Sequence, residues 1–189
     1  MNIRFSRSLI LAALVVAAPT LVAAKQHSMK NPTVGGAAMI STKSIAVNAS
    51  AAPNLTTLVA AVKAAGLVDT LASPGPFTVF APTNTAFDKL PEGTVGTVLK
   101  PENKALLTTI LTYHVVAGKL TSKDVLAAIK AGGGKATLTT VAGAKISARL
   151  SGNSIVITDG KGGQSAVTTA DVMQSNGVVH VIGLVKRLG

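Results

Sequence analysis

The sequence predicts a single α+β domain with helices in the first half of the chain and strands in the second. In the first half, apolar residues recur at helical spacing, as Leu55, Leu58 and Val62 do. After the glycine run 132–134 the apolar period changes to two, which is typical of half-buried strands. Helices that precede strands, without alternating with them, favour an α+β arrangement over βαβ units. The chain has no internal repeat, so we expect one copy of the module.

Residues 1–24 have the features of a secretory signal peptide. Arg4 and Arg7 precede an apolar stretch over residues 8–18, which is short for a membrane span. Small residues then precede a predicted cleavage site before Lys25. We therefore expect an exported mature protein that has no transmembrane anchor once the signal peptide is removed.

Residues 25–48 are polar and contain two adjacent glycines, so we expect an N-terminal arm or linker ahead of a domain over residues 49–189. Apolar side chains such as Val34, Met39 and Ile45 would let the arm dock on the domain. A flexible linker is the alternative for this segment.

The first predicted helix begins at Asn54 as its N-cap and ends at Gly66. A second short helical turn follows over residues 67–71. Both lie before segment 75–91, which predicts the local structure more clearly than any other part of the chain.

In segment 75–91, the aromatic and β-branched run from Phe77 to Phe80 predicts a strand that ends at Pro82. Thr83 or Asn84 would then cap a short helix. Three of the four Phe residues of the chain lie in this segment, and aromatic residues make up only 3% of the sequence. We expect these rings to form the hub of the core.

The remaining helical elements are bounded by turn and cap signals. Residues 91–96 are predicted to form a turn, and Pro101 occupies the favoured first position of the next helix. That helix passes near Tyr113 into a short strand. Thr121 or Ser122 would cap a further helix. Period-two alternation and the turns at 159–160 and 176–177 then predict strands over residues 136–140, 146–150, 154–158, 166–168 and 178–182.

The chain is strongly basic, with a net charge of +11, which falls to +9 once Arg4 and Arg7 are removed with the signal peptide. This balance favours anionic partners such as a polysaccharide or an envelope lipid. The alternative is that scattered lysines only solvate the surface. The scarcity of aromatic residues argues against a nucleic-acid platform. The chain has no cysteine, so an exported domain must rely on its hydrophobic core.

Three segments, in order along the chain, resemble the motifs of the fasciclin (FAS1) domain family: residues 75–91, 111–116 and 170–182. The resemblance covers roughly residues 46–188. It implies a single FAS1 domain, a β-wedge of two sheets with helices packed at one end. It also implies an extracellular or surface role in adhesion. Gly183 departs from the family, since many members carry an acidic or polar residue there.

The resemblance also implies a possible interaction surface at Tyr113, His114, Asp171 and Met173, because peptides around the matching motifs have been proposed as integrin contacts in animal relatives. The residues themselves favour a different interpretation for the histidines. His114 and His180 lie between apolar neighbours, which is typical of a structural imidazole bonded to a backbone group.

The sequence contains no recognisable catalytic motif. The segment around Ser165 lacks the second glycine of a nucleophile elbow, and the acidic residues are too separated for paired acid–base work. We therefore expect no enzymatic activity, no cofactor and no metal.

These observations lead to one main functional prediction and one alternative. We expect a secreted or periplasmic, monomeric protein that acts in cell adhesion or in contact with the extracellular matrix. The alternative is a carrier of a small apolar ligand such as a carotenoid, as some fasciclin-like proteins are. A core rich in small aliphatic residues could leave an apolar groove for such a ligand.

Overall fold

The computed structural model describes residues 31–160 and 162–183, so the predicted signal peptide and His27 lie outside the described part of the chain. The elements before the main sheet and around its first strands are β1 (Thr33–Val34), β2 (Ala37–Ala38), α1 (Ile45–Ala51), the 3₁₀ turn η1 (Pro53–Leu55), α2 (Thr56–Ala65), α3 (Val68–Ala72), β3 (Phe77–Pro82), α4 (Asn84–Phe87), α5 (Thr94–Val98), the 3₁₀ turn η2 (Pro101–Asn103), α6 (Lys104–Tyr113) and β4 (Val115–Ala117). The later elements are α7 (Ser122–Ala131), β5 (Lys135–Thr139), β6 (Lys145–Ser151), β7 (Ser154–Thr158), β8 (Gln164–Gln174) and β9 (Gly177–Ile182).

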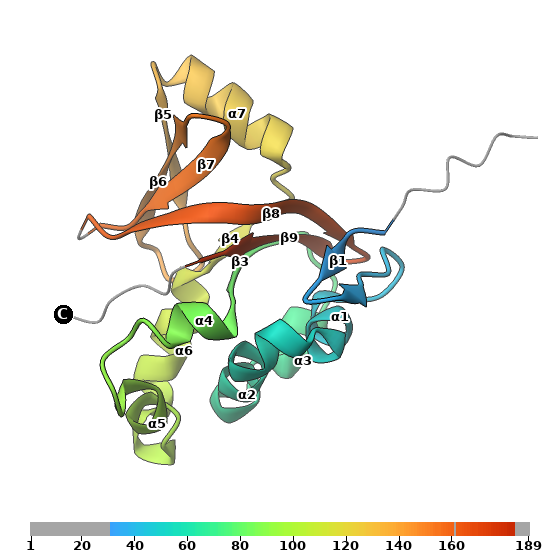
Figure 1. Ribbon diagram of the computed structural model, residues 1–189, viewed down its shortest axis with the longest axis vertical. Helices are drawn as coiled ribbons and strands as arrows, with labels where there is room; N and C mark the ends of the chain where they lie inside the picture. The colour runs from blue at the N-terminus through green and yellow to red at the C-terminus, as the bar shows by residue number, and fades with distance from the viewer. Residues whose placement is uncertain (1–30, 161, 184–189) are drawn as a thin grey trace, which may run out of the picture.

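A seven-stranded sheet in the order β4-β3-β9-β8-β7-β6-β5 organises the domain. Strands β3 and β9 pair in parallel, and the other neighbours pair antiparallel. The long strand β8 belongs to two half-sheets, because its first residues pair with β7 and the rest pair with β9. The half-sheets diverge from β8 (Figure 1). An isolated antiparallel bridge joins Val116 of β4 to Thr140, which directly follows β5. The α+β class and the FAS1-type wedge are therefore confirmed.

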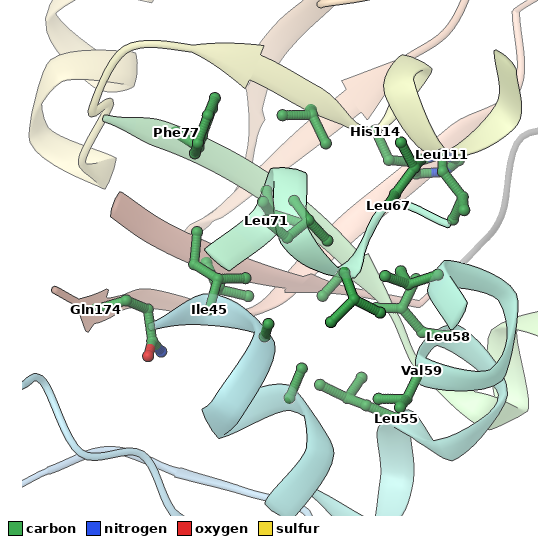
Figure 2. A pocket seen from close by; sticks show the side chains of 18 of the residues that line it. Ile45, Leu55, Leu58, Val59, Leu67, Leu71, Phe77, Leu111, His114 and Gln174 are labelled. Carbon is green, nitrogen blue, oxygen red and sulfur yellow. The ribbon is translucent and has the colours of Figure 1, made fainter. Parts of the chain in front are cut away.

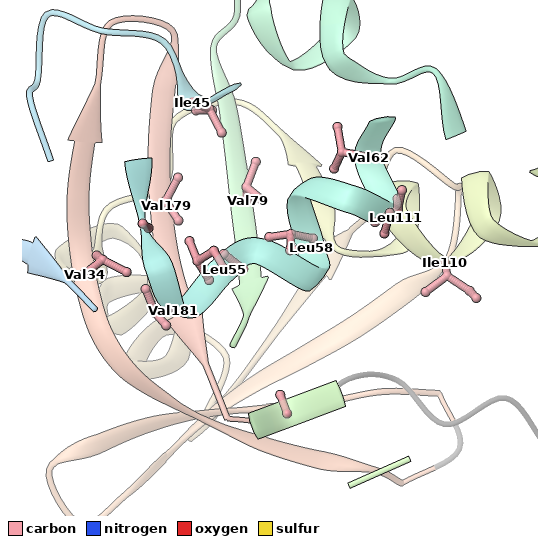
Figure 3. Packing of buried hydrophobic residues seen from close by; sticks show 14 of the residues in the cluster. Val34, Ile45, Leu55, Leu58, Val62, Val79, Ile110, Leu111, Val179 and Val181 are labelled. Atoms are coloured by element: carbon pink, nitrogen blue, oxygen red, sulfur yellow. The ribbon is translucent and has the colours of Figure 1, made fainter. Parts of the chain in front are cut away.

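Two hydrophobic clusters fill the space on either side of β3 and β9. Val79 and Val179 face the helices, and their side chains belong to one cluster with those of Leu55, Leu58 and Leu111 from α2, its preceding turn and α6 (Figure 3). The alternate side chains of the same strands face the interior of the wedge. There Phe80 and Ile182 pack in the second cluster, which α7 covers with Val125 and Ile129. Strand β3 is thus buried on both faces, as a central strand should be.

The prediction that the Phe rings of segment 75–91 form one hub of the core is wrong. Phe80 is buried in the cluster inside the wedge, whereas Phe77 and Phe87 are only partly buried and pack against the helical cluster. The strand alternates its side chains between two separate cores, so rings that are close in sequence point to opposite sides. Aliphatic residues make up most of both clusters.

Helix α1 begins at Ile45, inside the segment for which the sequence predicted an arm. The buried Asn48 holds this region in place. Its amide oxygen accepts the Ile40 N–H at 3.1 Å, and its amide nitrogen donates to the Ile40 carbonyl at 2.7 Å and to the Gln174 side chain. A helix of only seven residues carries little periodic signal, which is why the sequence did not reveal it.

The predicted N-cap role of Asn54 is also wrong, because Asn54 lies within η1 and α2 has no side-chain cap of its own. Of the two predicted caps of α4, Thr83 occupies the N-cap position without a side-chain cap hydrogen bond, whereas Asn84 supports the start of α2. Its amide oxygen accepts the Thr57 N–H at 3.1 Å, and its amide nitrogen donates to the Thr56 hydroxyl at 2.9 Å. The first motif and α2 are therefore fastened together by a side chain from a different helix.

Several local signals have the predicted structure. Gly66 ends α2 in the left-handed conformation, with φ of 72°. Thr121 and Asp124 form a reciprocal capping box at the start of α7. The hydroxyl of Thr121, and to a smaller extent its backbone N–H, lower the pKa of the Asp124 carboxyl.

The segment 91–96 differs from its prediction as a turn. Gly93, with φ of 77°, is the N-cap of the short helix α5, so the turn leads directly into a helix.

Candidate functional site

An apolar cavity of about 100 Å³ lies between the helices α1, α2, α3 and α6 and strand β3. The side chains of Ile45, Leu58, Leu71, Phe77 and Leu111 converge on it, as Figure 2 shows. Cavities with such linings stay dry and can hold a benzene-sized molecule at about 150 Å³, while pockets for drug-sized ligands occupy about 300–1,000 Å³. The cavity is therefore large enough for a small apolar group and smaller than a typical ligand pocket.

The first two predicted interaction residues lie together at the end of α6, and both are buried. Tyr113 is 6% exposed and His114 is 8% exposed. The Tyr113 hydroxyl oxygen accepts the Gly160 N–H at 3.1 Å, and the His114 Nδ1 lies 2.8 Å from the Ile110 carbonyl oxygen. Burial raises the pKa of Tyr113, which the Gly160 N–H opposes and the charge of Asp159 reinforces. The role of this pair in binding a partner stays a prediction.

The other two predicted residues lie on β8. Asp171 has a φ of 57°, a left-handed conformation that Asp tolerates better than most residues. Its carboxylate accepts the Ser122 N–H at 2.6 Å and the Ser122 hydroxyl. Met173 is half-buried and pairs with Val178 in the β8–β9 hairpin. Asp171 therefore fastens β8 to the start of α7, and its role in partner binding stays a prediction.

A polar network around the loop 118–122 was missed by the sequence analysis. The buried Thr78 hydroxyl donates to the Gly118 carbonyl at 2.6 Å and accepts the Leu120 N–H at 2.8 Å. The Nε2 of His180 lies 2.8 Å from the Leu120 carbonyl oxygen. Only the pairing of β3 with β9 brings Thr78 and His180 together, so no local pattern could have revealed the network. The only signal in the sequence is one polar residue in each of two apolar strands, Thr78 and His180, and this signal does not identify their partners.

The bonds around His180 assign its tautomer and its charge. Nε2–H donates to the Leu120 carbonyl, and Nδ1 accepts the Asp171 N–H at 3.3 Å, so the ring is neutral. Burial lowers the pKa of His180, while the Leu120 carbonyl and the Asp171 charge oppose that shift. Phe80 stacks on the ring at a centroid distance of 5.6 Å. These contacts make His180 a structural group, as the sequence had indicated.

Within residues 31–160 and 162–183, no cluster of three or more His, Cys, Asp or Glu side chains is arranged to hold a metal ion. In the same part of the chain, no single helix is long and apolar enough to cross a membrane. The helical segments 45–51 and 53–65 are long and apolar enough only when taken together, and they are bent by 104° relative to each other, so they meet the criterion by length and composition only.

A wedge of two half-sheets that share β8, with helices packed over one face, is the architecture of a FAS1-type domain. The family model described as "Fasciclin domain" matches residues 53–185. The chain therefore belongs to the fasciclin domain family.

Similar proteins come from several bacteria. The chain is 42% identical over 165 residues to Protein sll1483 of Synechocystis sp., covering 87% of this chain and 84% of that protein. It is 39% identical to the immunogenic protein MPB70 of Mycobacterium bovis, covering 83% of this chain and 76% of the relative. It is 47% identical over 100 residues to the cell surface glycolipoprotein MPB83 of the same species, covering 50% of this chain and 44% of that one.

Among solved structures, the FAS1 domain pair from the insect cell adhesion molecule fasciclin I resembles this chain with a TM-score of 0.69. The sequence identity is 19%, and the match covers 77% of this chain and 51% of the domain pair. At this identity the likeness establishes the shared fold.

Replacing Asp171 by Ala is expected to lower the free energy of unfolding by about 2–3 kcal/mol, because the Ser122 N–H and hydroxyl lose a charged acceptor. Asp171→Asn should cost less, since Asn also tolerates positive φ and keeps an acceptor oxygen. Urea denaturation measures both, with the exposed Asp88→Ala as the matched control. Unchanged stability together with lost partner binding would make Asp171 a contact residue.

Stability is expected to fall on acidification from about pH 7.5 to 5, because the folded pKa of His180 lies below its ordinary value of about 6.5. The unfolded state then binds more protons than the folded state in this range, so the free energy of unfolding decreases as the pH falls. Thermal unfolding at both pH values measures the effect. His180→Gln should be less stable at pH 7.5 and less sensitive to pH; an identical pH dependence in both proteins would contradict the assignment.

Proposed function

We propose that the chain is an exported, non-catalytic protein that attaches to a cell-surface or extracellular component. The observation that carries the proposal is membership of the fasciclin domain family over residues 53–185. One relative is named a cell surface glycolipoprotein, and the structural neighbour comes from a cell adhesion molecule. The features of a signal peptide in residues 1–24 support export to the periplasm or the medium.

The charge of the chain supports an anionic component as the partner. The full chain carries a net charge of +11, or +9 once Arg4 and Arg7 are removed with the predicted signal peptide, which favours association with anionic polymers or surfaces through long-range attraction. In this proposal the protein acts as a monomer, and its binding surface is polar. The partner is part of the envelope or the matrix around the cell.

A strain that lacks the gene is expected to attach less to surfaces and to neighbouring cells, and the purified protein is expected to bind envelope material from the host. Because exposed charges are screened within about 8–10 Å at 0.1–0.15 M salt, binding should weaken steeply between 50 and 500 mM salt. Attachment assays and pull-downs at the two salt concentrations measure these effects. Unchanged attachment together with no binding to envelope material would refute the proposal.

A second candidate function is the carriage of a small apolar ligand, and the cavity beside β3 is the observation that favours it. None of the relatives named above has a name that describes a ligand carrier. At about 100 Å³ the cavity holds a small apolar group, so a long carotenoid would require the helices α1 to α3 to move apart.

Ala49→Leu would place a larger side chain in this cavity, and it tests the carrier function. The substitution should reduce binding of a fluorescent apolar probe and preserve or raise the thermal stability, because filling a cavity adds packing contacts. The control is Ala60→Leu, an exposed position on α2. Equal probe binding by both variants, and no coloured or apolar compound in solvent extracts of protein from the host, would exclude a carrier.

A further inference from the structure

The half-sheet formed by β5, β6, β7 and the first part of β8 has one buried face and one polar face. On β5 and β6, Ala136, Leu138 and Ile146 are buried in the cluster under α7, so the alternate side chains point the other way. We call that second surface the outer β-face. Helix α7 packs on the opposite side of β5 and β6 (Figure 1).

Cross-strand pairing arranges the outer β-face in rows. The first row contains Lys135, Arg149, Val156 and Ala166, and the second contains Thr137, Ser147, Thr158 and Gln164. Thr139 and Lys145 begin a third row. Rows on one face of a sheet are spaced by about 7 Å, and neighbouring strands by about 4.8 Å. The face therefore presents three cations among hydroxyl and amide groups on a regular surface.

The cations on this face lack carboxylate partners within the described residues. Lys135 and Arg149 lie directly opposite each other, and like charges in that relation destabilise a strand pair. Arg149 donates one hydrogen bond to the Gln164 side chain at 2.6 Å, which holds the guanidinium across the face. The neighbouring Asp159 lies in the turn after β7, where its carboxylate accepts the Gly163 N–H at 2.8 Å. A bound anion would offset the repulsion between Lys135 and Arg149.

The chemistry of the face distinguishes among anionic partners. Among the described residues, the rows of this face contain no Phe or Tyr, so they offer no ring on which a nucleic-acid base could stack. Val156, the largest apolar residue of these rows, is only 9% exposed, so the rows present no large apolar group that could enter a bilayer. Hydroxyl and amide groups beside cations can bond both the hydroxyls and the acidic groups of a sugar polymer.

We propose that the outer β-face binds an anionic polysaccharide through Lys135, Lys145 and Arg149. This inference rests on the proposed attachment function and names the partner class and the surface. The acidic groups of the polymer lie over the cations, and its hydroxyls bond Thr137, Thr139 and Ser147. The extended shape of a polysaccharide matches the rows of the face, which run across several strands.

The test uses the exported protein and immobilised alginate, dextran sulfate and neutral dextran. The variant Lys135→Gln/Lys145→Gln/Arg149→Gln removes the cations of the outer β-face. The control Lys43→Gln/Lys63→Gln/Lys104→Gln removes the same charge from exposed positions on the helical side. The face variant should bind at least one anionic polymer about tenfold more weakly, whereas the control should change the dissociation constant less than threefold. The salt dependence should become shallower in the face variant.

A second variant, Thr137→Glu, adds a carboxylate to the second row, which lies between the cations of the first and third rows, and removes no lysine; it should also weaken binding. Circular dichroism confirms that each variant is folded. Equal losses in the face variant and the control would overturn the inference, as would binding only to phosphatidylglycerol vesicles. If the wild-type protein binds host envelope material but neither anionic polymer, the inference fails and the attachment function stands. If it binds no envelope material, the attachment function itself fails.

Discussion

The parallel pairing of β3 with β9 is the contact on which the rest of the domain depends. It joins residues one hundred positions apart, from Phe77 opposite Gly177 to Pro82 opposite Ile182. The strands begin so close together that a Cβ on Gly177 would lie 2.0 Å from the Phe77 carbonyl oxygen, and one on Gly75 would lie 2.0 Å from the Asn176 carbonyl oxygen. Only glycine fits at either position without a shift of the backbone.

This contact also gathers the helices. The buried Asn176, which precedes β9, accepts the Ile45 N–H at 3.0 Å and donates to the carbonyls of Leu71 and Ser73. A single amide thus fixes the start of α1 and the end of α3 against the first residues of the strand pair. On the other face of the pair, Thr78 and His180 hold the loop that leads into α7. Both layers of the domain are positioned from the same two strands.

The sequence predicted what depends on neighbouring residues and missed what depends on this long-range pairing. The strand at Phe77, the helix end at Gly66 and the helix cap at Thr121 follow from local chemistry, and the structure has all three. The roles of Asn84 and Asn176 do not, because their partners lie far away in the chain. Asparagine before a turn or a helix usually indicates a side chain that bonds its own neighbouring backbone. In this protein the amides of Asn84 and Asn176 bond distant segments of the chain.

Residues whose side chains hold the fold together are poor candidates for a binding surface in this protein. Tyr113, His114 and Asp171 belong to segments that identify the family, and the structure uses their polar atoms for contacts inside the domain. A residue whose side chain secures the fold is expensive to change, because a lost partner leaves a buried donor or acceptor unsatisfied. The exposed side chains of β5 and β6 carry no such constraint, since their alternate neighbours hold the core. The exposed cations there secure no part of the core, and Lys135 opposite Arg149 costs stability; a partner that offsets this repulsion gives such a pair a physical reason, which is why the proposed binding surface is placed on these strands and not at the motif residues.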